Sequence, residues 1–188
     1  AEPTPIVGIG RQRVGENRNW LVFDESMIGQ IAADALLDRG FSSIGYVGAV
    51  RLGDGIDPRY QAFRDRVLAA GKPAPGTFTG TPLVSATPRL LKDRRGAAQD
   101  RLCNWLESMP KPAGIFACND SIGYQVIKAA ARAECHVPDQ LAVLGAYDDD
   151  LFVSLADPEL ASIRLPFEKI GFDAATLIIE GFETQRCT

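Results

Sequence analysis

Histidine is almost absent from this sequence, and cysteine occurs in no metal-binding pattern. The one histidine, His136, is not accompanied by a C-x-x-C pair or a second histidine, so no metal site is predicted. The cysteines are scattered singly, at Cys103, Cys118, Cys135 and Cys187. Because unpaired thiols are typical of a reducing compartment, we expect no disulfide framework and a cytoplasmic location.

An excess of positive charge and long apolar runs are also missing. The net charge of −4 argues against this chain itself holding a nucleic-acid backbone. No apolar run reaches the roughly 20 residues of a membrane span, and the first residues do not form a signal peptide. The 188 residues, 46% of them hydrophobic, suit one domain or one and a half.

Common enzyme and cofactor motifs are lacking as well. The chain has no P-loop and no G-x-S-x-G motif, and Gly8, Gly10 and Gly15 do not have the spacing of a dinucleotide fingerprint. The acidic run 148–150 lacks the spacing of a calcium loop. We therefore predict no catalysis and no cofactor.

The clearest pattern that is present covers residues 114–150. Two apolar runs flank a segment with apolar residues at helical spacing from Ile122 to Ala133. This strand–helix–strand order predicts two neighbouring parallel strands, with the helix as their crossover. The remaining segments continue the alternation, so the chain is predicted to be α/β. Strands are expected near residues 5–10, 20–23, 43–49 and 161–165, and helices near 28–36, 59–70, 102–109 and 167–178, with a short strand near 77–79 or 82–84.

Polar residues follow both strands of this central pattern. Asn119 and Asp120 end the first strand, and Tyr147 and Asp148 end the second. Ligands of open parallel sheets bind at the carboxyl ends of the strands, which makes these four residues candidate binding residues. The alternative is local: Asp120 caps the following helix and Asn119 completes a loop.

Two earlier residues have the same ambiguity. Asp24 ends a strand and precedes a helix, so it is either a cap or a ligand contact. Arg59 opens a helix, where its positive charge opposes the helix dipole, so it should have another partner. That partner is either a surface carboxylate or a bound polar ligand.

Several of these residues form a familiar series. It runs from Asp24 through Arg59-x-x-x-Phe63, Gly114-Ile-Phe-Ala-Cys-Asn119-Asp120 and Val143-Leu-Gly145 to Ser162-Ile-x-x-Pro-x-x-x-x-Gly171. It resembles the effector-binding domain of the lactose/galactose-repressor family, which shares the fold of periplasmic sugar-binding proteins. The runs Arg59-Tyr-Gln-Ala-Phe-Arg and Arg101-Leu-Cys-Asn-Trp-Leu are most similar to the family's xylose operon regulators.

The resemblance implies a parallel-sheet α/β domain of two lobes, with a sugar between them. It implies that residues 1–41 end the first lobe, 42–162 form the complete second lobe, and 163–188 return to the first. The rest of the first lobe and a DNA-binding domain are expected outside this chain. The implied partners are a sugar effector, operator DNA through that other domain, and a second copy in a homodimer, with no membrane.

The resemblance also assigns roles. Asp24, Arg59 and Asn119 match positions that hydrogen-bond sugar hydroxyls, and their acceptors and donors suit that task. The sequence departs from the family at Tyr147, where an aspartate is usual, and at Leu165, where many members have glutamine. Either a one-residue bulge brings Asp148 into the aspartate position, or the sugar specificity differs from that of the family.

The expected function is thus sugar sensing in a bacterial transcriptional regulator, with a pentose such as xylose as the implied ligand. Three alternatives remain open at this point. They are a periplasmic sugar-binding protein of the same fold, an enzyme on an α/β scaffold, and a fragment that binds nothing alone and self-associates through exposed apolar surface.

Overall fold

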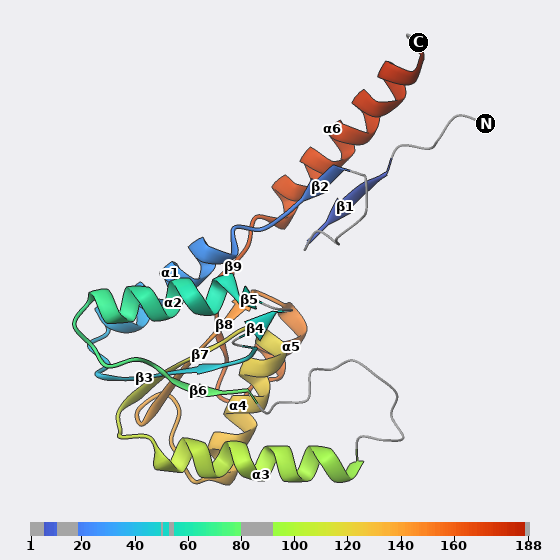
Figure 1. The fold of residues 1–188 in the computed structure, drawn as a ribbon. Coiled ribbons are helices and arrows are strands. Elements are labelled where there is room, and N and C mark those ends of the chain that lie inside the picture. Colours follow the sequence, from blue (N-terminus) through green and yellow to red (C-terminus); the bar gives the residue numbers. More distant parts are fainter. Residues whose placement is uncertain (1–5, 11–18, 50, 53–54, 80–91, 187–188) are drawn as a thin grey trace. The chain divides into compact units, whose positions relative to one another are not determined.

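The computed structural model describes residues 6–10, 19–49, 51–52, 55–79 and 92–186 (Figure 1). The chain divides into two units. Residues Glu25–Arg164 form a central unit, and the flanking segments Ala1–Asp24 and Leu165–Thr188 form a flanking unit.

The central unit is built around a five-stranded parallel sheet with the strand order β6-β3-β7-β8-β9. The strands are β3 (Ser43–Val47), β6 (Gly76–Phe78), β7 (Ala113–Ala117), β8 (Leu141–Tyr147) and β9 (Ala161–Arg164). The helices are α1 (Glu25–Asp38), α2 (Pro58–Ala69), α3 (Lys92–Ser108), α4 (Asp120–Arg132) and α5 (Asp150–Leu155). A short antiparallel pair, β4 (Arg51–Leu52) and β5 (Gly55–Ile56), precedes α2.

The predicted strand–helix–strand unit is confirmed, because β7 and β8 are parallel neighbours connected through α4. The chain runs outward from β3 to the edge strand β6 and then returns to place β7 on the other side of β3. The direction of winding therefore reverses between β3 and β7. In open parallel sheets this reversal opens a crevice at the carboxyl ends of the strands.

Helices cover both faces of this sheet, α1 and α2 on one and α3 and α4 on the other (Figure 1). All five residues of β7 are buried, as expected for a strand that is covered on both sides. On the α1–α2 face, the ring of Phe116 lies 5.6 Å from Tyr46 and 5.2 Å from Phe63 between centroids. On the other face, Ile115 joins the apolar side chains of α3 and α4, among them Leu102, Leu106, Ile122 and Val126.

Close packing of α1 on α2 depends on Gly29. A Cβ atom at Gly29 would overlap the carbonyl oxygen of Arg59 and would lie 2.9 Å from the backbone nitrogen of Phe63. The hydrogen atom of this glycine therefore lets the two helix backbones approach each other. Their approach brings Glu25, at the start of α1, beside Arg59 at the start of α2.

We expect Gly29→Ala to destabilise the protein by about 1–3 kcal/mol, because neither backbone can move away without repacking. Urea unfolding followed by circular dichroism would measure this change. Gly76→Ala is the matched control, since a Cβ there would lie at an ordinary 3.5 Å from Trp105. It should change stability by less than about 0.5 kcal/mol. Equal effects of the two substitutions would contradict a special role for Gly29.

The flanking unit contains two short parallel strands, β1 (Val7–Ile9) and β2 (Asn19–Leu21), and the helix α6 (Phe167–Arg186). The rings of Phe23 and Phe167 meet edge to face, with centroids 5.4 Å apart. Among the helices of the described residues, none combines the length and the apolar character needed to cross a bilayer.

Three details bear on the sequence-based expectations. The boundary between the contact units falls at Glu25, because α1 packs on α2 and on β7, and the predicted lobe boundaries at residues 41 and 162 stay predictions. The β4–β5 pair lies before α2, where no strand was expected from the sequence. The short strand is β6, close to the expected residues 77–79, and the alternative at residues 82–84 lies outside the described residues.

Candidate functional site

Arg59 lies in the first turn of α2, directly after a helix cap. Asp57 is the N-cap residue, and its carboxylate accepts hydrogen bonds from the backbone nitrogens of Arg59, at 2.9 Å, and Tyr60, at 3.4 Å. Pro58 occupies the first helical position, where its missing N–H costs nothing. The local sequence Asp-Pro-Arg therefore starts the helix at a fixed residue and places the arginine at the carboxyl edge of the sheet.

The guanidinium of Arg59 connects four elements of the central unit. Its Nε donates to Glu25 Oε2 at 2.7 Å, and its Nη2 lies 2.5 Å from the same oxygen. The Nη2 group also donates to the hydroxyl of Tyr147 at 3.0 Å, and Nη1 donates to the carbonyl oxygen of Cys118. Arg59 is 3% exposed. The start of α1, the start of α2 and the carboxyl ends of β7 and β8 thus meet at one buried cation.

Arg59 remains charged in these surroundings. Burial by itself lowers the pKa of the guanidinium, but Tyr147 and Glu25 raise it, and the net shift is upward. The ring of Tyr147 adds a cation–π contact, with its centroid 5.1 Å from the Arg59 Cζ. Burial also raises the pKa of the Cys118 thiol to about 11, so this neighbour is neutral near pH 7.

The sequence predicted a partner for Arg59 but did not identify Glu25. The two expected kinds of partner were a surface carboxylate and a bound ligand. The observed partner is a carboxylate of the protein, but a largely buried one, with 15% of its side chain exposed. Asp24, the neighbouring candidate, is the last residue of the flanking unit. Its role in ligand binding stays a prediction.

Asn119 caps α4, whereas one of the two readings of the sequence placed that cap at Asp120. The Oδ1 atom of Asn119 accepts from the backbone nitrogen of Ile122 at 2.9 Å and from the Ser121 hydroxyl at 2.8 Å. Asp120 is instead the first helical residue, so the expectation that it is the cap was wrong. Among the described residues, none accepts a hydrogen bond from the Nδ2 group of Asn119, which leaves two donors at the edge of the sheet.

Asp120 is buried beneath this edge, at 1% exposure. Its Oδ2 accepts from the backbone nitrogen of Asp149 at 2.8 Å, and its Oδ1 accepts from the Ser162 hydroxyl at 2.6 Å. Burial raises the pKa of the Asp120 carboxyl, although both hydrogen bonds act in the opposite direction. The carboxylate thereby ties α4 to the segment after β8 and to β9.

Tyr147 and Asp148 end β8 in an unusual backbone conformation, with φ values of 103° and 56°. Positive φ is strained for residues with side chains, and neighbouring contacts must hold it. Here the backbone nitrogen of Asp148 donates to the Ser162 hydroxyl at 3.0 Å, which in turn is bound to Asp120. The turn therefore rests on the buried Asp120 carboxylate.

After this turn, the side chains of Tyr147 and Asp148 contact different arginines. Tyr147 contacts Arg59, whereas the Asp148 carboxylate pairs with Arg164 at 2.6 Å. The β8–β9 pairing continues without interruption to Tyr147↔Arg164, so the predicted one-residue bulge is absent from it. Of these two strand-end residues, Tyr147 is therefore the one that contacts Arg59.

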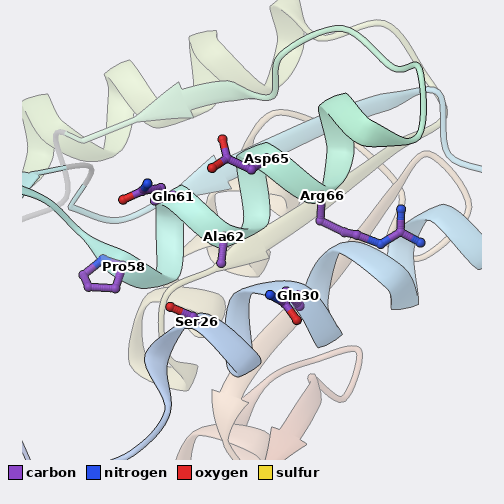
Figure 2. A pocket seen from close by; sticks show the side chains of 7 residues that line it. All are labelled: Ser26, Gln30, Pro58, Gln61, Ala62, Asp65 and Arg66. Atoms are coloured by element: carbon purple, nitrogen blue, oxygen red, sulfur yellow. The ribbon is translucent and has the colours of Figure 1, made fainter.

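A separate surface pocket of about 360 Å³ lies between α1 and α2 (Figure 2). Its lining residues are Ser26, Gln30, Pro58, Gln61, Ala62, Asp65 and Arg66. None of the predicted site residues lines it, and its one cation, Arg66, pairs with Asp34 at 2.6 Å. The described residues contain no group of three or more side chains arranged to hold a metal ion.

Asp120→Asn should destabilise the protein by about 1–3 kcal/mol, because an amide cannot accept both hydrogen bonds. The loss should depend on pH. The folded-state pKa of Asp120 is raised above the ordinary 3.8, so the folded state keeps this proton to higher pH than the unfolded state. The stability that Asp120 contributes therefore falls as pH rises above that value.

The asparagine variant lacks this titration, so its deficit relative to the wild type should be largest in acid and should shrink toward pH 7. Urea unfolding of both proteins between pH 3.5 and pH 7 would measure the deficit. A deficit that grows with pH would show that the folded-state pKa is lowered instead.

Comparison with known proteins places this chain in a family. A family described as "Periplasmic binding protein-like domain" matches residues 33–186, and the chain belongs to it. The predicted α/β fold and the predicted resemblance are both confirmed by this match.

The relatives are transcriptional regulators. The HTH-type transcriptional regulator GntR of Pseudomonas aeruginosa is 32% identical over 165 residues, which cover 88% of this chain and 45% of that protein. The xylose operon regulatory protein of Escherichia coli strain K12 is 30% identical over 81 residues, 43% of this chain and 21% of that protein. This chain therefore spans less than half the length of either relative.

The fold is shared with a solved regulator as well. The structure of the xylose-binding transcription activator xylR superposes with a TM-score of 0.73 at 22% identity, covering 96% of this chain and 47% of that one. At this identity the likeness concerns the fold alone.

Proposed function

We propose that this chain is the sugar-binding effector domain of a bacterial transcriptional regulator. The observation that carries the proposal is the buried Arg59 guanidinium, which lies at the strand-order reversal and binds a hydroxyl group, that of Tyr147. Ligands of open parallel sheets bind at this position, and sugars present hydroxyl groups. The transcriptional-regulator names of the relatives give the biological setting.

In this proposal the side chains around Arg59 form the ligand-facing edge of the central unit. Arg59 donates to sugar hydroxyls, the Nδ2 group of Asn119 donates to another, and Tyr147 exchanges its own hydrogen bond for one to the ligand. Asp24 and Asp148 supply acceptors. Asp120 takes part indirectly, because its carboxylate already holds the backbone that positions Tyr147 and Asp148.

A pentose such as xylose is the proposed ligand. This choice rests on the names of a relative and of a structural neighbour, which are a xylose operon regulator and a xylose-binding activator. Sugar binding would favour a closed arrangement of the two lobes and would pass that preference to a DNA-binding domain of the parent protein. The proposed setting is a homodimer in the cytoplasm.

Calorimetric titration of the full natural protein with D-xylose, L-arabinose, D-ribose, D-glucose and D-galactose tests the ligand class. We expect saturable binding of at least one pentose. Arg59→Lys should weaken it by at least about tenfold, since lysine keeps the charge opposite Glu25 but loses the planar fork of donors. Arg64→Lys is the matched control on the same helix, because Arg64 pairs with Asp65 on the surface. Absence of binding to every sugar would overturn the assignment.

A second experiment separates regulation from transport. The full natural protein, mixed with DNA from the region upstream of its own gene, should bind with an affinity that the same sugar changes by about 5–150-fold. Fluorescence anisotropy of the labelled DNA would measure this. Sugar binding without any DNA binding would support the alternative of a periplasmic sugar-binding protein.

A further inference from the structure

The positive charge of Arg59 is already matched by a carboxylate of the protein. Glu25 Oε2 contacts both Nε and Nη2 of the guanidinium, and the two side chains are 15% and 3% exposed. A second carboxylate, that of Asp57, is buried two residues before Arg59. The Cys118 thiol is neutral near pH 7 and adds no further charge. Among the described residues at this position, acids therefore balance or exceed the one buried cation.

The remaining side of the guanidinium bears a neutral hydroxyl. Tyr147 receives a hydrogen bond from Nη2 at 3.0 Å, while the carboxylate of Glu25 lies on the Nε side of the group. Arg59 thus binds one carboxylate, one uncharged hydroxyl and, through Nη1, the backbone carbonyl of Cys118 at the same time. The hydroxyl of Tyr147 has the chemistry of a sugar hydroxyl and occupies a donor that a ligand could take.

We propose that Glu25 determines the charge specificity of the site, so that it accepts neutral sugars and rejects sugar acids and sugar phosphates. This inference rests on the proposed function, because it concerns the ligand class of the same site. Its physical basis is that the positive charge of Arg59 is already matched by the negative charge of Glu25. A free arginine fork would bind a carboxylate or phosphate in two parallel hydrogen bonds, but here a protein carboxylate already holds one side of the fork.

An entering anion would meet Glu25 across a single guanidinium that is shielded from water. Two carboxylates that share one cation repel each other, and burial makes this repulsion costly because little solvent screens it. A neutral hydroxyl adds no charge beside Glu25, and the Tyr147 hydroxyl is such a group in contact with Nη2. Specificity then arises from a built-in repulsive group as well as from attractive contacts.

Matched pairs of neutral and acidic sugars test this proposal in the full natural protein. Suitable pairs are D-xylose with D-xylonate, D-glucose with D-glucuronate, and D-galactose with D-galacturonate, each titrated by calorimetry at pH 7.5. The wild type should bind the neutral member of a pair at least about tenfold more tightly. Glu25→Gln keeps the shape of the side chain and one acceptor. It should lower the ratio of neutral-sugar affinity to acid affinity by about tenfold or more.

Glu107→Gln is the matched control, because it removes one exposed acid at the end of α3, on the other face of the sheet. It should leave the ratio unchanged. Thermal unfolding of each variant would confirm that it is folded.

The outcomes separate the two proposals. Failure of the wild type to bind any sugar of either kind would overturn the sugar-binding function itself. Tight binding of an acid by the wild type would leave that function standing and overturn the role of Glu25, as would a Glu25→Gln protein that binds the neutral sugar with an unchanged ratio. If Glu25→Gln does not fold, the ratio is measured for the wild type and for Glu25→Asp, which keeps the negative charge. A preference for the acid in either protein contradicts the proposal.

Discussion

Burial of the Arg59 guanidinium is the constraint on which the rest of the central unit depends. An unpaired buried cation would cost several kcal/mol, so it requires partners, and here these come from α1, β7 and β8. A shift of any one of these elements would leave part of the guanidinium without a partner. The close contact at Gly29 and the Asp57 cap belong to the same arrangement, because they fix the helices that carry Glu25 and Arg59.

Periodicity was enough to predict the sheet and its helices, because β7, β8 and α4 each carry a strong and unambiguous apolar pattern. The need of Arg59 for a partner was also predictable from its place in a first helical turn. The identity of that partner was not. Glu25 reaches the guanidinium because of the way α1 packs against α2, and that packing has no signature in the local sequence.

A one-residue uncertainty affected the strand ends. Whether Asn119 or Asp120 caps α4 depends on the residue at which the helix starts, and two neighbouring polar residues give the sequence no means to choose. The directions of the Tyr147 and Asp148 side chains depend on positive φ angles, which residues with side chains seldom adopt. Such angles are held by distant partners, in this case by Asp120 and Ser162, and so have no local signature.

The division of the chain has a consequence for how the protein folds. The central unit is one uninterrupted segment, whereas the flanking unit is assembled from two segments that the whole central unit separates. Joining those segments through an unfolded chain would require closure of a very long loop, at an entropic cost. Folding of the central unit replaces this flexible loop by an ordered one and so lowers the entropic cost of bringing the two segments together. The path of the chain therefore favours folding of the central unit before that of the flanking unit.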